Sequence, residues 1–158
     1  MSNNLEILVI EGHGEGGTEL SAFDSALCDA GVGDYNLIYL SSVVPVGATV
    51  QIAEKFLAGE NDVGKKLYCV ISRSFLNPNS CGSWVGLGWS YHVNKGGIFI
   101  EESGSSHEDV KRKIETAYCE MAERRGDIGE LTQLIVETHV SKQCSCAVLL
   151  AVFQIEHW

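Results

Sequence analysis

The sequence contains no long hydrophobic run, although 45% of its 158 residues are hydrophobic. A helix that spans a bilayer needs roughly 20 consecutive apolar residues, so we expect no membrane partner. The first residues, MSNNLEILVI, also lack the basic segment and small-residue cleavage site of a secretion signal. We therefore expect a cytoplasmic protein, with a length that suits one domain over residues 1–158.

Basic residues are few, because 11 lysines and arginines stand against 21 acidic residues and give a formal net charge of −10. This sign of charge is wrong for binding a phosphate backbone, which argues against a nucleic-acid partner. An acidic surface would attract small cations, but it also keeps a protein dispersed in solution.

Patterns of metal ligands are missing as well. None of the six cysteines forms a C-x-x-C pair, and none of the five histidines belongs to an H-E-x-x-H motif. Cys144 and Cys146 would share one face of a strand, yet no second pair of ligands lies near them in the sequence. We expect reduced thiols, no metal, and histidines that lie in loops, in strands or on the surface.

Two helices and several strands are predicted by the hydrophobic pattern. A helix over 19–31 has apolar residues at spacings of three and four and ends at Gly31. A second helix over 106–125 has Ser106 as its cap, acidic residues in its first turn and arginines in its last. The order of elements suggests an α+β layered fold with the helices outside. The predicted strands cover 5–11, 35–40, 66–74, 83–93, 96–102, 131–140 and 144–155.

The segment 12–17, GHGEGG, matches the G-x-G-x-x-G pattern of dinucleotide-binding proteins. Such a unit also needs an acidic residue near the end of its second strand to bind the ribose. Here the second strand ends in IYLSS, without a carboxylate. We therefore favour a glycine-rich turn that ends the first strand and lines a substrate pocket.

Ser41 and Ser42 follow a hydrophobic strand and precede a bend that contains Pro45 and Gly47. A peptide bond at such a bend could be held under strain, although an ordinary turn has the same composition.

Two carboxylates occupy positions where a ligand could reach them. If the strand alternation continues, Glu101 shares the face of Phe99 and is partly shielded from water, which suits a proton donor. A strand-end carboxylate in water is the alternative. Asp24 lies at the edge of an apolar helix face, where it would bind a cationic ligand or remain a solvated charge.

The chain resembles the pyruvoyl-dependent arginine decarboxylases, most strongly over residues 8–50. The likeness departs at His13, at Gly17 and over 55–82. The matching residues are Glu15-Gly16, Thr18, Ala22-Phe23-Asp24, Ala26-Leu27, Ala30-Gly31, Gly33, Asn36-Leu37-Ile38, Ser41-Ser42 and Pro45, and more weakly Gly97-Ile98-Phe99-Ile100-Glu101, Glu120-Met121-Ala122 and Arg125-Gly126.

This resemblance implies scission between Ser41 and Ser42, which gives a β chain of residues 1–41 and an α chain of residues 42–158. Ser42 would become a covalent pyruvoyl group, which forms a Schiff base with L-arginine and replaces PLP in its decarboxylation to agmatine and CO2. Glu101 would donate the proton, Asn36 would orient or polarise the cleavage site, and Asp24 would bind the substrate guanidinium.

The resemblance also implies a four-layer αββα sandwich with two outer helices over mainly antiparallel strands. Trimers or hexamers of cleaved units would place the active sites between subunits. Two alternatives stay open at this point. The same chemistry could act on aspartate or histidine, or the chain could be an unprocessed oligomeric protein that binds small molecules.

Overall fold

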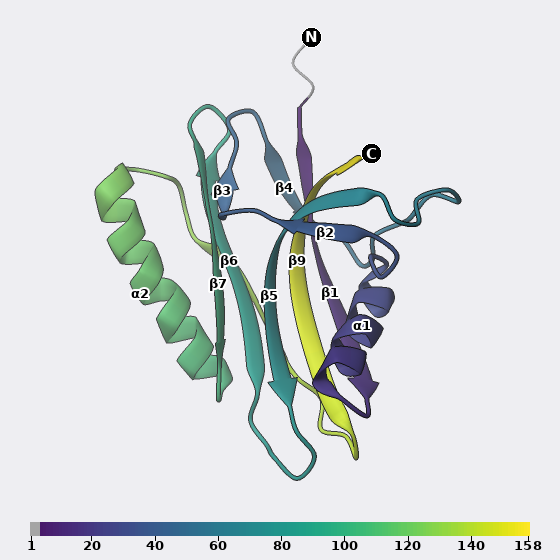
Figure 1. The fold of residues 1–158 in the computed structure, drawn as a ribbon. Helices are drawn as coiled ribbons and strands as arrows, with labels where there is room; N and C mark the ends of the chain where they lie inside the picture. Colours follow the sequence, from purple (N-terminus) through teal and green to yellow (C-terminus); the bar gives the residue numbers. More distant parts are fainter. Residues whose placement is uncertain (1–3) are drawn as a thin grey trace.

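Two β-sheets packed face to face, each with one helix on its outer side, form the fold (Figure 1). A computed structural model describes it over residues 4–158. The elements, in chain order, are β1 (Glu6–Gly16), α1 (Glu19–Ala30), β2 (Asn36–Tyr39), β3 (Val43–Val44), β4 (Thr49–Ile52), β5 (Lys66–Leu76), β6 (Trp84–His92), β7 (Gly96–Gly104), α2 (His107–Arg125), β8 (Thr132–Glu137) and β9 (Cys144–Glu156).

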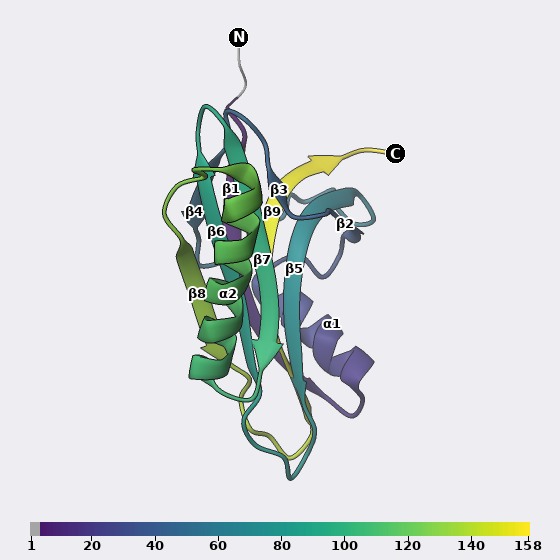
Figure 2. The same cartoon turned by 90° about the vertical axis from the view of Figure 1, so that its left-hand side faces the viewer.

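A five-stranded sheet has the order β2-β5-β9-β1-β4, and a four-stranded sheet has the order β3-β7-β6-β8. Two pairs are parallel, β1 with β4 and β2 with β5. The others are antiparallel. Figure 2 shows α2 lying across the four-stranded sheet, with α1 on the far side of the molecule. The predicted αββα sandwich is confirmed.

Apolar side chains fill the space between the layers. Ile7, Leu87 and Phe99 are fully buried between the two sheets. Ala22 and Ala26 of α1 pack on the outer face of the five-stranded sheet. Val110 and Ile114 of α2 pack on the outer face of the four-stranded sheet. Removing this area from water is the main force that holds the four layers together.

The helix ends that the sequence predicts at Ser106 and at Gly31 are present in the structure. The side chain of Ser106 accepts a hydrogen bond from the backbone N–H of Asp109 and caps α2. Gly31 ends α1 with a φ of 87°, a left-handed conformation that suits glycine. Within the described residues, no helix combines the length and apolar character that crossing a bilayer demands.

The prediction of a glycine-rich turn after the first strand is wrong. β1 continues to Gly16 and pairs with β9 along that whole stretch. Gly12, Gly14 and Gly16 face α1, and a Cβ at any of them would overlap atoms of the helix. These glycines therefore let α1 lie directly on β1. The match to the G-x-G-x-x-G pattern is explained by this helix packing.

Two further differences concern short elements. β3 and β4 lie in the segment that we expected to be a bend, and they flank Pro45 and Gly47. Strands of two and four residues are too short to produce a recognisable alternation. The strand predicted over 131–140 ends at Glu137, after which residues 138–143 form a loop.

All six cysteines lie in the described part of the chain, and none forms a disulfide. Burial raises the pKa of the Cys69 thiol and that of the Cys146 thiol to about 12. These two side chains thus behave as small apolar core residues.

The close packing of α1 on β1 can be tested with Gly14→Ala. The new methyl group would overlap the backbone of Ala22 and Ala26, so we expect a loss of about 1–3 kcal/mol in the free energy of unfolding, as overpacking typically costs. Gly17→Ala is the matched control, because nothing lies within 4 Å of a Cβ at that position. Urea denaturation should show little change for the control, and an equal loss in both variants would contradict the packing role.

Candidate functional site

The Ser41–Ser42 junction lies where the chain crosses from one sheet to the other. β2 is an edge strand of the five-stranded sheet, and β3 is an edge strand of the four-stranded sheet. The backbone N–H of Leu40 donates to the carbonyl of Cys69 on β5, at 2.9 Å. The backbone N–H of Phe99 on β7 donates to the carbonyl of Ser42, at 2.8 Å. The junction is therefore held at both ends, once on each sheet.

Ser42 has a strained backbone, with a φ of 67°. This left-handed conformation places the Cβ too close to the carbonyl oxygen and costs roughly 1–2 kcal/mol. Among residues 4–158, Asn79 is the only other non-glycine residue with a positive φ. The strain therefore lies next to the peptide bond at which the sequence resemblance implies scission.

The hydroxyl of Ser42 donates a hydrogen bond to Oε1 of Glu101. These two residues are 59 positions apart in the sequence, and β7 brings them together. Phe99 and Glu101 stand opposite Trp89 and Leu87 of β6, both of which belong to the core between the sheets. Glu101 therefore has the partly buried position on the Phe99 face that we predicted.

Asn36 lies at the exposed start of β2. Its amide Nδ2 donates to the carbonyl of Gly64, at 2.7 Å, and the indole Nε1 of Trp158 donates to the same carbonyl, at 2.8 Å. The side chain of Asn36 is thus bonded to the loop before β5 rather than to Ser42.

Asp24 is exposed on α1. In the described part of the chain, its carboxylate has neither a hydrogen-bond nor an ion-pair partner, so it is available to a cationic ligand. Burial raises the pKa of the Cys28 thiol, and the charge of Asp24 raises it further. Asp24 belongs to α1, which covers the outer face of the five-stranded sheet, whereas Glu101 belongs to β7 of the four-stranded sheet. Figure 1 shows α1 and β7 on opposite sides of the five-stranded sheet. One chain therefore does not bring these two carboxylates together.

Apolar side chains near the junction are unusually exposed. Val43, which follows Ser42, is 56% exposed, and Val46 is 68% exposed. A hollow beside them is lined by Val43, Val44, Pro45, Val46, Lys95, Gly96, Gly97, Arg125, Asp127 and Ile128. Residues 4–158 contain no cluster of three or more His, Cys, Asp or Glu side chains that could hold a metal.

The fold and the junction together define a class of protein. The αββα sandwich is the fold that the sequence resemblance implied for a pyruvoyl-dependent decarboxylase, and Ser42 and Glu101, two residues that the resemblance singled out, are in contact in it. Comparison with known proteins identifies the family. The family model for pyruvoyl-dependent arginine decarboxylase matches residues 6–157. The chain belongs to this family.

Individual relatives agree with this assignment. "Pyruvoyl-dependent arginine decarboxylase 2" of Archaeoglobus fulgidus is 30% identical over 152 residues, which cover 95% of this chain and 96% of the relative. The pyruvoyl-dependent arginine decarboxylase of Methanothermobacter thermautotrophicus is 32% identical over 155 residues, which cover 94% of this chain and 96% of the relative. That of Thermococcus kodakarensis is 30% identical over 147 residues, which cover 87% of each chain.

An alanine variant is usually more stable than the glycine variant at the same position. The backbone strain at Ser42 predicts the opposite order of stability there. Without a Cβ, glycine adopts a left-handed backbone at little cost. Ser42→Gly should therefore be more stable than Ser42→Ala by about 1 kcal/mol in urea denaturation. Neither variant has the hydroxyl, so both should be single chains and directly comparable.

Ser41 supplies the control, because its φ is not in the left-handed region. In the Ser42→Ala background, Ser41→Gly should be less stable than Ser41→Ala, since glycine loses more backbone entropy on folding. If alanine were more stable than glycine at both positions, or glycine more stable at both, the result would contradict the strain at Ser42.

Proposed function

We propose that this chain cleaves itself between Ser41 and Ser42 and then decarboxylates L-arginine to agmatine and CO2. The observation that carries the proposal is the hydrogen bond from the Ser42 hydroxyl to Glu101 at a strained bend between the two sheets. Family membership supports both the pyruvoyl group and the substrate.

The reacting bonds of the cleavage step all lie at the junction. The Ser42 hydroxyl attacks the carbonyl carbon of Ser41, and the peptide C–N bond breaks to leave an ester and a free amine on Ser42. Loss of the Ser42 α-proton and of the ester oxygen then releases residues 1–41 with a terminal carboxylate and leaves dehydroalanine at position 42. Addition of water and loss of ammonia convert this residue into the pyruvoyl ketone. The hydrogen bond to Glu101 orients the attacking hydroxyl.

The pyruvoyl group supplies the electron-withdrawing carbonyl chemistry that decarboxylation requires. Glu101 lies within hydrogen-bond reach of position 42, which supports our assignment of its carboxyl group as the proton donor to the substrate carbon that has lost CO2. We assign substrate binding to Asp24, whose exposed carboxylate would form a charge-assisted pair with a guanidinium group. Asn36 fixes the start of the strand that leads into the junction, through its bond to Gly64.

A single chain does not bring Asp24 to Glu101, so we propose that the active site forms between subunits of a homotrimer or hexamer. Exposed Val43 and Val46 beside Ser42 support this assembly, because contact with another subunit would remove their apolar area from water. We propose one cleaved domain per chain, in the cytoplasm. The six unpaired cysteines are typical of that reducing compartment.

Intact mass and product analysis test this function together. The purified protein should contain two chains, with a carbonyl-reactive group at the start of the second, and should release agmatine from arginine. Aspartate and histidine should release no CO2 under the same conditions. One continuous chain without a reactive carbonyl would favour a binding protein, and two chains that act only on another amino acid would overturn the choice of arginine.

The Ser42→Ala variant should stay a single chain of 158 residues, because it lacks the hydroxyl that attacks the Ser41 carbonyl. Ser103→Ala is the matched control, since Ser103 is exposed on β7 and should not affect cleavage. Mass spectrometry of both proteins after equal incubation measures the outcome. A cleaved Ser42→Ala protein would mean that another group is the nucleophile.

Glu101→Gln should still cleave but decarboxylate at least about 100-fold more slowly. The amide oxygen of glutamine can still accept the Ser42 hydrogen bond, whereas the amide cannot act as a general acid, whose contribution is typically 10²–10⁴-fold. Glu102→Gln, at the next position of the same strand, is the control and should keep most of the turnover. Equal rates for wild type and Glu101→Gln would remove Glu101 from the proton transfer.

A further inference from the structure

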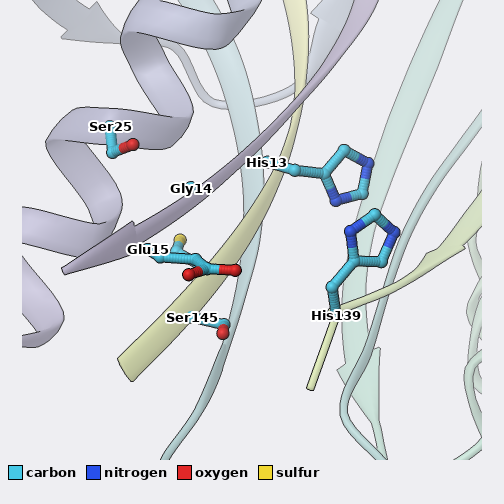
Figure 3. Close-up of a pocket in the computed structure, with 7 residues that line it drawn as sticks. His13, Gly14, Glu15, Ser25, His139 and Ser145 are labelled. Atoms are coloured by element: carbon cyan, nitrogen blue, oxygen red, sulfur yellow. The ribbon is translucent and has the colours of Figure 1, made fainter. Parts of the chain in front are cut away.

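A second hollow, of about 350 Å³, lies where the end of β1 meets α1, β9 and the loop after β8 (Figure 3). It includes neither Ser42 nor Glu101. Its lining residues are His13, Gly14, Glu15, Ser25, His139, Ser145 and Cys146. The volume lies within the usual range for pockets that bind small molecules.

His13 contributes a ring nitrogen that lacks a partner. Its Nε2 lies 3.3 Å from Oε2 of Glu11, and because a carboxylate only accepts, Nε2 must carry the hydrogen. In the neutral ring Nδ1 is then an acceptor, and this buried atom has no donor within the described residues. The ring itself is fixed, because it stacks on His139 with the centroids 4.4 Å apart and the planes at 5°.

Ser145 contributes a second unpaired group. The residue is only 2% exposed, and its Oγ has no hydrogen-bond partner in residues 4–158. Leaving a buried polar group unpaired costs roughly 1–3 kcal/mol. Glu15 stands opposite Ser145 in the pairing of β1 with β9, so its carboxylate borders the same hollow.

The charges around this hollow favour a cation. None of its seven lining residues is a lysine or an arginine. Glu15 is the one charged carboxylate among them. Glu11 at the ring and Asp29, whose Oδ2 accepts the backbone N–H of His13 at 2.8 Å, contact His13 from an adjoining hollow that also contains Lys55. Nδ1 and the carboxylate accept hydrogen bonds, and a serine hydroxyl can accept as well. The matching ligand therefore carries positive charge and several N–H donors.

We propose that the hollow formed by His13, Glu15, His139 and Ser145 binds a small organic cation that bears a guanidinium or primary ammonium group. The N–H groups of the ligand pair with Nδ1 of His13, the Glu15 carboxylate and Oγ of Ser145. This site is separate from the Ser42 junction, and it does not depend on cleavage or on decarboxylation.

The test follows the ring C–H signals of His13 and His139 by NMR in the purified protein. Methylguanidine or methylamine should shift both signals saturably. Tetramethylammonium, which has the charge but no N–H donor, should not. If neither N–H probe shifts these signals, or if tetramethylammonium shifts them equally, the proposal is overturned.

Variants separate this site from general attraction to an acidic protein. Glu15→Gln should raise the Kd of the probe about tenfold. His13→Phe keeps an aromatic ring on His139 but removes Nδ1, so it should raise the Kd at least fivefold, measured on the His139 signal. Glu123→Gln removes an exposed carboxylate of α2 and is the control, with an unchanged Kd. Wild-type affinity in both Glu15→Gln and His13→Phe, with each variant folded, would also overturn the proposal.

Discussion

The contact between the two sheets is the constraint on which the junction at Ser42 depends. One hydrogen bond holds Leu40 to the five-stranded sheet, and another holds Ser42 to the four-stranded sheet. The distance between these two anchors is set by the apolar core that includes Phe99. Because interiors are close-packed, the crossing has little freedom to relax, and the left-handed backbone of Ser42 persists. The same core fixes β7, which carries Glu101 to the hydroxyl.

The layered architecture also separates the two carboxylates that we assign to the proposed active site. Glu101 stands opposite Leu87 of the core between the sheets, whereas Asp24 belongs to the helix that packs outside the five-stranded sheet. The side-chain amide of Asn36, at the start of the strand that leads to the junction, donates its hydrogen bond to the carbonyl of Gly64. The side chains to which we assign the reaction and the one to which we assign substrate binding thus belong to different layers, and the proposed site would be completed by a second subunit.

Much of the fold could be predicted from local patterns, because helix caps such as Ser106 and Gly31 and long apolar strands have short-range signals. The role of the glycines in β1 could not, since a turn and a strand packed on a helix both favour residues without a Cβ. Strand alternation predicts that Glu101 shares the face of Phe99. Only the family resemblance implied that Glu101 acts together with Ser42, which lies 59 positions away in the sequence. His13 and His139 gave no local signal, because only the tertiary fold stacks them.

β1 lies inside the five-stranded sheet, between β9 and β4. A cut after Ser41 would leave β1, α1 and β2 in one fragment and both neighbours of β1 in the other. The two fragments would then be interlocked: nine residue pairs join β1 to β9, and four more join it to β4. Separating them would require opening a sheet in its middle, so the cut protein would hold together as one folding unit, and its fragments would exchange only after global unfolding.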